Sequence, residues 1–391
     1  MELRVAREPD VPAEQNGPTG PSLDPLPNSW PNDPMQWPFA ATRLAVNACL
    51  WWMDREMAVS GRRGESALAW TTPNTIALEL ATFRLREFSR NDAGPPALIC
   101  APYALHRALI ADFATDHSIV EALGRGGVDR IYLTDWRAAS PEMRYLSIDN
   151  YLADLNVAVD RIGPPLDLIG LCQGGWMSLL YAARFPGKVR RLVLVGAPVD
   201  VSVGSELAQM VARTTMGAFA GLVTSGGGLA RGADLLRLWR ANPDMETALQ
   251  RTLPREDAQA EALRDRFARW HAETLDLPGV FYLEAVEKIF RENQLAKGSF
   301  VALGRELKLA ELTTPVFLLA GHNDEIVPPA QALATASLLG TPSALIASEV
   351  APCGHLGLFM GATTLATAWS RVAEWLSREE PAKIPTRVAS G

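Results

Sequence analysis

The chain has 391 residues, of which 48% are hydrophobic and 21% are charged, and 37 Lys and Arg against 44 Asp and Glu residues leave a formal net charge of −7. This acidic balance excludes a nucleic-acid partner, because phosphate binding needs a basic surface. The four cysteines are too few and too scattered for a disulfide framework. The cysteines and the five histidines also lack the spacing of metal ligands, so we expect no metal site. Because the sequence shows no membrane-spanning stretch and no secretory signal, we expect a cytoplasmic protein.

The N-terminal part of the chain is rich in proline. Nine prolines fall within residues 1–38, among Gly, Asn and Asp, and this composition prevents regular structure. We therefore predict a flexible arm over residues 1–38. A Trp-rich amphipathic pattern then predicts a helical segment over residues 39–71, which we interpret as packing onto the main domain, with a contact to another molecule as the alternative.

From residue 72 onward, short apolar runs alternate with helical patterns. Eight runs predict buried strands, at Thr75–Leu80, Phe83–Phe88, Ala97–Cys100, Ile131–Leu133, Leu166–Leu171, Leu192–Val195, Val316–Ala320 and Ala344–Val350. The repetition of strand, helix and strand from the third run onward predicts a mostly parallel, doubly wound sheet. Residues 201–310 interrupt it with a glycine loop and charged helical stretches, and we expect no strand there.

The strand predicted at Leu166–Leu171 leads directly into a candidate nucleophile. The stretch from Gly170 to Gly174 reads Gly-Leu-Cys-Gln-Gly, and a helical pattern follows at once. This arrangement is typical of a nucleophile elbow, with Cys172 where lipases have serine. The N-terminus of the following helix favours the thiolate. The motif alone is weak, because a small buried cysteine can simply pack beneath a turn.

Two later strands are followed by the residues that a triad requires, in the order nucleophile, acid and histidine. Asp324 follows the strand Val316–Ala320, and His355 lies in a Gly-His loop after the strand Ala344–Val350. We predict that His355 takes the proton of Cys172, while Asp324 orients the imidazole and stabilises its charged form.

Two residues close to Asp324, Glu325 and His322, are alternative candidates for the acid and for a base. Glu325 is the alternative acid, in which case Asp324 would cap a helix that begins near Pro328. We expect His322 to be a loop residue and not a second base.

The oxyanion hole is predicted from backbone N–H groups. One donor is the N–H of Gln173, directly after the nucleophile. The second donor usually follows the third strand, and because Pro102 has no N–H, Tyr103 or Ala104 must supply it.

Together these motifs predict an α/β-hydrolase fold with a helical cap inserted after the sixth strand. We expect the core at residues 72–200 and 311–380, the cap at 201–310 and a C-terminal tail at 381–391. A cysteine nucleophile forms a thioester, so an acyl group arriving from a CoA thioester exchanges at little energetic cost and stays activated for transfer to a hydroxyl group. Whether water attacks instead depends on the cap and on solvent exclusion.

Three motifs resemble those of polyhydroxyalkanoate synthases: Gly170–Gly175, Asp324–Pro328 and the pair Gly354-His355. The resemblance covers roughly residues 75–380, with further similar stretches at Asp112–Val120, Tyr132–Trp136 and Glu292–Gly298. It implies that Cys172 carries the growing hydroxyacyl chain, that His355 activates the thiol and the chain-end hydroxyl, and that Asp324 assists. Tyr103, Gln173 and Trp136 receive at most supporting roles.

The resemblance also implies a setting for the protein. It suggests hydroxyacyl-CoA and the polyhydroxyalkanoate chain as substrates, with no metal or cofactor. It further suggests a homodimer or a second synthase subunit, and a location at the surface of storage granules.

The chain departs from the synthases after its cysteine, where they usually have an apolar residue and this chain has Gln173. A Cys-Gln pair is similar to the intracellular polyhydroxyalkanoate depolymerases, which also use a thiol. The stretches Thr134–Trp136, Tyr282–Val286 and Gly354–Gly361 are at least as similar to those depolymerases, whereas Gly174-Gly175 and Ile326–Pro328 resemble the synthases.

We therefore hold three functional hypotheses. The first is a synthase-like acyltransferase, the second a thiol depolymerase or (thio)esterase, and the third a non-catalytic hydrolase-fold protein that binds granules through its Trp-rich segment.

Overall fold

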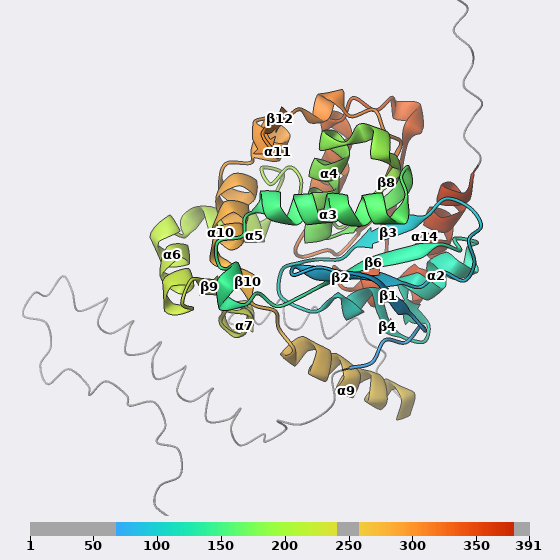
Figure 1. The fold of residues 1–391 in the computed structure, drawn as a ribbon, viewed down its shortest axis with the longest axis horizontal. Coiled ribbons are helices and arrows are strands. Elements are labelled where there is room, and N and C mark those ends of the chain that lie inside the picture. Colours follow the sequence, from blue (N-terminus) through green and yellow to red (C-terminus); the bar gives the residue numbers. More distant parts are fainter. Residues whose placement is uncertain (1–67, 241–257, 379–391) are drawn as a thin grey trace, which may run out of the picture. The chain divides into compact units, whose positions relative to one another are not determined.

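The computed structural model describes residues 68–240 and 258–378 (Figure 1). The arm predicted at 1–38, the helical segment up to residue 67 and the tail predicted at 381–391 lie outside the described residues.

A single eight-stranded sheet forms the centre of the described chain. Its spatial order is β1-β2-β6-β3-β7-β8-β13-β14, and each strand corresponds to one predicted apolar run. Only β2 runs antiparallel to its neighbours, so the predicted mostly parallel sheet is confirmed. The strands are β1 (Thr75–Glu79), β2 (Phe83–Glu87), β3 (Ala97–Cys100), β6 (Ile131–Trp136), β7 (Leu166–Leu171), β8 (Val189–Val195), β13 (Val316–Gly321) and β14 (Ile346–Ala351).

One strand extends well beyond its apolar run. The sequence predicts a strand that ends at Leu133, but β6 continues to Trp136. Its polar residues are buried and paired: Thr134 Oγ1 accepts a hydrogen bond from the Ala101 N–H at 3.0 Å, and Asp135 forms an ion pair with Arg86 at 2.7 Å. Partners supplied by neighbouring segments allow polar side chains inside the sheet, and hydrophobicity alone does not reveal them.

Helices cover both faces of the sheet. The helix α2 (Ile119–Arg125) connects β3 to β6 in one direction across the sheet, whereas α3 (Ile148–Ile162) and α4 (Gln173–Arg184) serve connections in the opposite direction. Because such connections are right-handed, α2 lies on one face and α3 and α4 lie on the other. The last helix, α14 (Ala362–Ser377), packs against α2.

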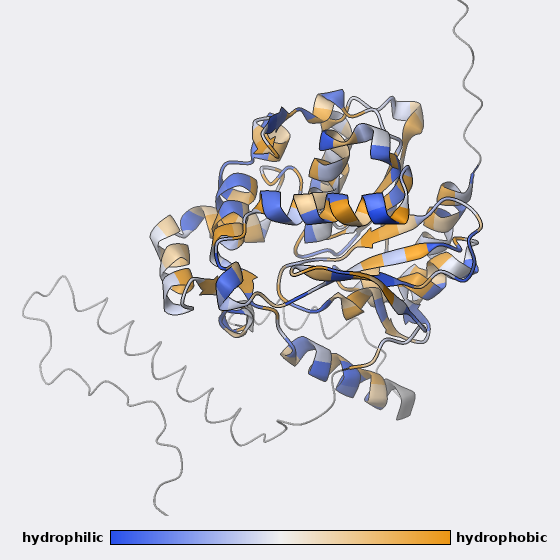
Figure 2. Cartoon of the chain, in the orientation of Figure 1, coloured by the Kyte–Doolittle hydropathy of each residue, from blue (hydrophilic) through white to orange (hydrophobic). Residues whose placement is uncertain are grey.

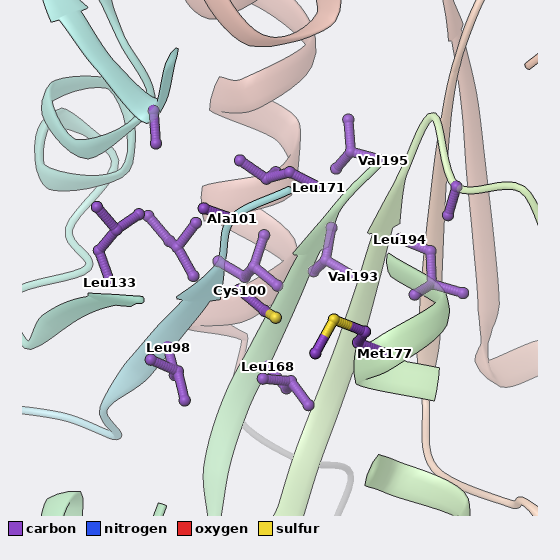
Figure 3. Packing of buried hydrophobic residues seen from close by; sticks show 14 of the residues in the cluster. Leu98, Cys100, Ala101, Leu133, Leu168, Leu171, Met177, Val193, Leu194 and Val195 are labelled. Atoms are coloured by element: carbon purple, nitrogen blue, oxygen red, sulfur yellow. The ribbon is translucent and has the colours of Figure 1, made fainter. Parts of the chain in front are cut away.

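Mostly apolar side chains of the central strands form the interior between these helices. Figure 3 shows Cys100 of β3 among side chains of β7, β8 and α4, including Leu168, Val193 and Met177. Figure 2 shows the same division, with hydrophobic residues along the central strands and hydrophilic residues on the outer helices.

A long insertion follows β8, the sixth strand of the sheet in chain order, as the sequence predicts. Figure 1 shows most of its helices beyond one end of the sheet, at the left of the view, and the helix at Ala258–Ala272 below the strands. Its helical elements are α5 (Glu206–Arg213), α6 (Met216–Ser225), α7 (Gly232–Arg240), α9 (Ala258–Ala272), α10 (Gly279–Glu284), the π-helix η5 (Ala285–Arg291), α11 (Gln294–Lys297) and the 3-10 turn η6 (Leu309–Glu311).

The expectation that this insertion holds no strand is wrong. Two short antiparallel pairs occur there, β9 (Leu229–Ala230) with β10 (Leu277–Pro278), and β11 (Phe300–Ala302) with β12 (Arg305–Leu307). Strands of two or three residues are too short to produce an alternating pattern, and tertiary contacts determine them.

The remaining elements are short. They are η2 (Ala108–Ala111), β4 (Asp112–Ala114), β5 (His117–Ser118), η3 (Pro141–Met143), η4 (Pro186–Lys188), α12 (Pro329–Ala334), η7 (Thr335–Leu338), η8 (Ser343–Leu345) and α13 (Gly357–Met360).

Candidate active site

Cys172 occupies a strained turn between β7 and α4. Its backbone has φ 48° and ψ −115°, a conformation that side chains other than glycine rarely adopt. Two hydrogen bonds hold this turn: the Cys172 N–H donates to Val195 O at 2.8 Å, and the Gly175 N–H donates to Cys172 O at 2.8 Å. The structure therefore has the geometry of a nucleophile elbow, which projects the thiol from the end of the sheet.

Three glycines let this turn form. A Cβ on Gly174 would lie 2.1 Å from the carbonyl oxygen of Cys100, and one on Gly170 would lie 2.5 Å from the Cα of Gly175. A Cβ on Gly175 would lie 2.3 Å from the Cβ of Ala197. Close approach of the elbow to β3 and to the end of β8 thus requires residues without side chains at all three positions.

Asp324 and His355 come together at the carboxyl ends of β13 and β14. The Nδ1 atom of His355 lies 2.8 Å from Asp324 Oδ2, and both side chains are almost completely buried. The other carboxylate oxygen, Oδ1, accepts hydrogen bonds from the backbone N–H groups of Ile326 at 2.9 Å and Val327 at 2.8 Å. The carboxylate is thereby fixed in the orientation that holds the imidazole.

Electrostatic interactions favour the protonated form of His355. Burial alone would lower the pKa of the imidazole, but the Asp324 carboxylate and the adjacent Cys172 side chain raise that pKa well above its ordinary value. A histidine with this environment can receive a proton from the thiol and stabilise the thiolate that remains.

The ring of His355 is held from two further directions. The edge of the ring faces Phe359, with the centroids 5.2 Å apart. On the β8 side, a Cβ on Gly196 would lie 3.2 Å from His355 Cε1, and Gly196 has a φ of 52°. Sequence reasoning missed Gly196, although its position directly after the strand Leu192–Val195 was a usable signal.

The two neighbours of the acid occupy different places. Glu325 Oε2 accepts a hydrogen bond from the backbone N–H of His355 at 3.4 Å and does not contact the ring. The side chain of His322 is exposed, and its backbone N–H donates a hydrogen bond to Ala351 O at 2.8 Å. Of the two carboxylates, Asp324 is thus the one that contacts the imidazole.

The candidate oxyanion residues lie on two segments near the elbow. Gln173 begins α4, where the first N–H groups have no acceptor within the helix. Tyr103 and Ala104 follow β3 in a segment anchored at Ala101, whose carbonyl oxygen accepts a hydrogen bond from Trp136 Nε1 at 2.7 Å. The assignment of these three N–H groups to an oxyanion hole stays a prediction.

The side chain of Tyr103 has a structural environment. It is fully buried, its hydroxyl lies 2.9 Å from that of Tyr151, and its ring packs on Trp136, Tyr151 and Phe281. Burial raises the pKa of this phenol far above its ordinary value, so it stays protonated. Its aromatic contacts join the segment after β3 to α10 of the insertion.

Two further cysteines of the described residues lie in less reactive environments. Burial raises the pKa of the Cys100 thiol to about 12, and burial also raises the pKa of Cys353. Cys49 lies outside the described residues.

Within residues 68–240 and 258–378, no cluster of three or more His, Cys, Asp or Glu side chains is arranged to hold a metal ion. In the same ranges, no helix is both long and apolar enough to span a membrane.

The chain is similar to known proteins in sequence and in fold. Residues 106–362 match the family model described as alpha/beta hydrolase fold. The chain is 29% identical over 312 residues to the poly(3-hydroxyalkanoate) polymerase subunit PhaC of Synechocystis sp., with 76% of this chain and 82% of that protein covered. It is 26% identical over 340 residues to the subunit of the same name from Haloferax mediterranei, with 83% of this chain and 68% of that protein covered. A solved hydrolase from Pseudomonas aeruginosa PA01 shares the fold, with a TM-score of 0.50, 16% identity, and 78% and 98% of the two chains covered.

Proposed function

The chain belongs to the alpha/beta hydrolase fold family, and from that premise we propose that it is a polyhydroxyalkanoate synthase-like acyltransferase with Cys172 as nucleophile, His355 as base and Asp324 as orienting acid. The observation that carries the proposal is the 2.8 Å contact between His355 and Asp324 beside a cysteine-bearing elbow. The similarity to polymerase subunits from two organisms supports the choice of reaction.

The first half-reaction loads the enzyme. His355 accepts the proton of the Cys172 thiol, and the sulfur attacks the thioester carbonyl of a hydroxyacyl-CoA. The carbonyl oxygen becomes an oxyanion, which the Gln173 N–H and an N–H from Tyr103 or Ala104 stabilise. The carbon–sulfur bond to CoA then breaks, and His355 returns its proton to the departing CoA thiolate. The product is a hydroxyacyl thioester on Cys172 and free CoA.

The second half-reaction extends the chain. His355 removes the proton of a hydroxyl group at a chain end, and that oxygen attacks the Cys172 thioester. An ester bond forms, the bond to the cysteine sulfur breaks, and the proton on His355 restores the thiol. A thioester and an alcohol are thus converted to an ester and a thiol at each cycle.

A hydrolytic reaction is the second candidate, and the polar Gln173 beside the nucleophile favours it. With water as the acceptor, the same Cys172 thioester, or one formed from an ester of the polymer, would release free hydroxy acid. The third candidate, a granule-binding protein without catalysis, depends on residues 39–57, which lie outside the described residues.

The proposal extends to the surroundings of the enzyme. We propose hydroxyacyl-CoA as the acyl donor, no metal or cofactor, and a site of action at the surface of a storage granule in the cytoplasm. A homodimer or a complex with a second synthase subunit completes the proposed assembly, and sedimentation of the purified chain tests the dimer.

The experiment incubates the purified protein with 3-hydroxybutyryl-CoA, follows CoA release, and separates polymer from free acid. The Cys172→Ala variant tests the nucleophile, and Cys353→Ala serves as a matched control thiol. CoA release with polymer, lost only in Cys172→Ala, supports the synthase. Free acid that depends on Cys172 supports the hydrolase, and equal activity of both variants contradicts the triad.

A further inference from the structure

Two buried polar atoms at the start of α4 have no hydrogen-bond partner within the described chain: the amide oxygen Oε1 of Gln173 and the indole nitrogen Nε1 of Trp176. Buried polar groups in folded proteins are nearly always paired, so each exception calls for an explanation. Gln173 directly follows Cys172 and Trp176 lies four residues after it, and the triad uses neither side chain.

The other large buried tryptophans of the described chain all donate their indole N–H to a backbone carbonyl oxygen. Trp136 donates its N–H to Ala101 O at 2.7 Å, Trp270 to Arg107 O at 3.1 Å, and Trp369 to Leu358 O at 2.8 Å. Trp176 is equally buried, with 0% of its surface exposed, yet its N–H has no acceptor. Since the fold pairs the other three indoles, the unpaired N–H of Trp176 distinguishes this site.

The position of Trp176 explains how its side chain belongs to the site. Residues four apart share one side of a helix, and long side chains lean toward the helix N-terminus. Trp176 therefore leans toward the turn that holds Cys172. Its ring stacks on Phe281 of α10, with the centroids 6.3 Å apart, so the indole also contacts the insertion.

The close contacts of the glycines support this orientation. Gly174 and Gly175 approach β3 and the end of β8, so these positions mark the side of α4 that faces the sheet. Gln173 and Trp176 lie on the remaining side, toward Cys172 and away from the sheet.

The two unpaired atoms match the chemistry of one substrate class. Gln173 Oε1 is an acceptor that needs a donor, and Trp176 Nε1 is a donor that needs an acceptor. A hydroxyacyl group carries both, because its hydroxyl donates and its carbonyl oxygen accepts. A plain acyl group has the carbonyl but no hydroxyl, so it would leave the Gln173 oxygen unpaired.

We propose that Gln173 and Trp176 form the recognition site for the hydroxyacyl group, in which the Gln173 amide oxygen accepts a hydrogen bond from the substrate hydroxyl and the Trp176 indole N–H donates one to a carbonyl oxygen of the substrate. This inference rests on the proposed acyl transfer to Cys172, and it explains the polar residue after the nucleophile as a specificity element.

The test compares the rates at which 3-hydroxybutyryl-CoA and butyryl-CoA acylate Cys172, measured by rapid quenching and intact-protein mass. For the wild type we expect the hydroxyacyl donor to react about tenfold faster, since one hydrogen bond to a buried group separates the two donors. Gln173→Met should reduce this preference to less than about twofold. Trp176→Phe should slow both donors about tenfold and leave their ratio unchanged.

A matched variant separates recognition from packing. Trp176→Phe keeps an aromatic ring beside Phe281 and removes an N–H that has no acceptor in the described chain. The thermal midpoint should therefore stay within about one degree of the wild type. Trp369→Phe removes an N–H that is hydrogen-bonded to Leu358 O, and it should lower the midpoint while the donor preference stays at the wild-type value.

Three results would count against the account, and they can be told apart. An unchanged preference in Gln173→Met overturns the role of Gln173, and wild-type acylation by Trp176→Phe overturns the role of the indole. If neither CoA ester acylates the wild-type protein at Cys172, the proposed function itself fails, and the recognition site fails with it.

Discussion

The elbow at the start of α4 and the helix α6 in the insertion both contain glycines, but in opposite surroundings. At the elbow, a Cβ on Gly174 would meet the Cys100 carbonyl oxygen at 2.1 Å, whereas a Cβ on Gly221 in α6 would meet nothing within 4 Å. The helix α6 has no buried residue, whereas α4 buries nine of its residues, from Gly174 to Ala182. The elbow is therefore built to fixed dimensions around the nucleophile, whereas α6 leaves room for variation.

This difference separates two aspects of the chemistry. The core fixes Cys172, His355 and Asp324, to which we assign the acyl transfer under the proposed function. The insertion reaches the site through Phe281 of α10, which contacts Tyr103, Tyr151 and Trp176. We infer that the insertion influences which acyl group and which acceptor enter, and the following predictions test both halves of the comparison.

The largest effect is expected at the nucleophile itself. Cys172→Ala removes the atom that carries the acyl group, and turnover should fall by at least about 10⁴-fold, as for other triad nucleophiles. The folded structure should remain, because Cys172 is only partly buried and backbone hydrogen bonds with Val195 and Gly175 hold the turn. Circular dichroism checks the fold, and turnover within tenfold of the wild type would contradict the assignment.

The acid should have the next largest effect on turnover. Asp324→Asn keeps the shape of the side chain but removes the charge that holds the His355 imidazole, and we expect a loss of about 10²- to 10⁴-fold. Glu325→Gln is the matched control, since the Glu325 carboxylate accepts a hydrogen bond from the backbone N–H of His355 and Asp324 is the residue hydrogen-bonded to the ring. Equal losses in the two variants would show that the wrong carboxylate has been chosen.

The base has a matched control of the same residue type. His355→Ala should lower turnover far more than His322→Ala, because His322 is exposed, whereas the buried ring of His355 lies 2.8 Å from Asp324 Oδ2. Steady-state rates of CoA release from the two variants decide the point. Losses of similar size would mean that His355 is not the base.

Packing in the core gives a fourth prediction, on stability instead of activity. Gly174→Ala forces a Cβ against backbone atoms of Cys100 and Ala101, which cannot move without displacing β3. We expect a loss of roughly 3 kcal/mol or more in the free energy of unfolding, as for other overpacked core sites. Urea denaturation followed by fluorescence measures this loss, and a decrease below about 1 kcal/mol would contradict the fixed dimensions of the elbow.

Protonation of His355 links the site to pH. Its pKa is raised in the folded protein, so the proton is bound more tightly there than in the unfolded chain. This contribution to stability is fully present below the unfolded pKa of about 6.5, and it is lost as the pH rises through the folded value. His355→Gln should abolish this pH-dependent part of the thermal midpoint above pH 6.5, and an unchanged pH dependence would contradict the raised pKa.

The smallest effect is expected in the insertion. Gly221→Ala lies inside α6 with open space around its Cβ, and alanine is the better helix former. The variant should be as stable as the wild type or more stable by up to about 1 kcal/mol. The same glycine-to-alanine substitution should therefore lower the free energy of unfolding at Gly174 and leave it unchanged or raise it at Gly221. A clear destabilisation by Gly221→Ala would show that α6 packs against more than the described residues.

The sequence predicted the parts of the fold whose signal is local. Parallel strands buried on both faces appear as continuous apolar runs, which is why β3, β7 and β13 were found close to their actual ends. The positions of Cys172, Asp324 and His355 at strand ends followed from the same pattern.

What could not be predicted depends on contacts between distant segments. The extension of β6 requires Arg86 as the partner of Asp135, and the pairing of β9 with β10 joins residues nearly fifty positions apart. The unpaired N–H of Trp176 is invisible in the sequence, because a tryptophan in a helix pattern indicates core packing. Only the structure shows that Trp136, Trp270 and Trp369 are paired while Trp176 is not.

The most direct test of the central claim is to locate the acyl group on the protein. The purified chain is incubated briefly with 3-hydroxybutyryl-CoA, quenched in acid, digested, and analysed by peptide mass spectrometry. The account predicts a hydroxybutyryl thioester on Cys172 that hydroxylamine removes and that Asp324→Asn forms more slowly. An adduct on Cys49, Cys100 or Cys353 in preference to Cys172, or one that also forms at the wild-type rate in Cys172→Ala, would contradict it.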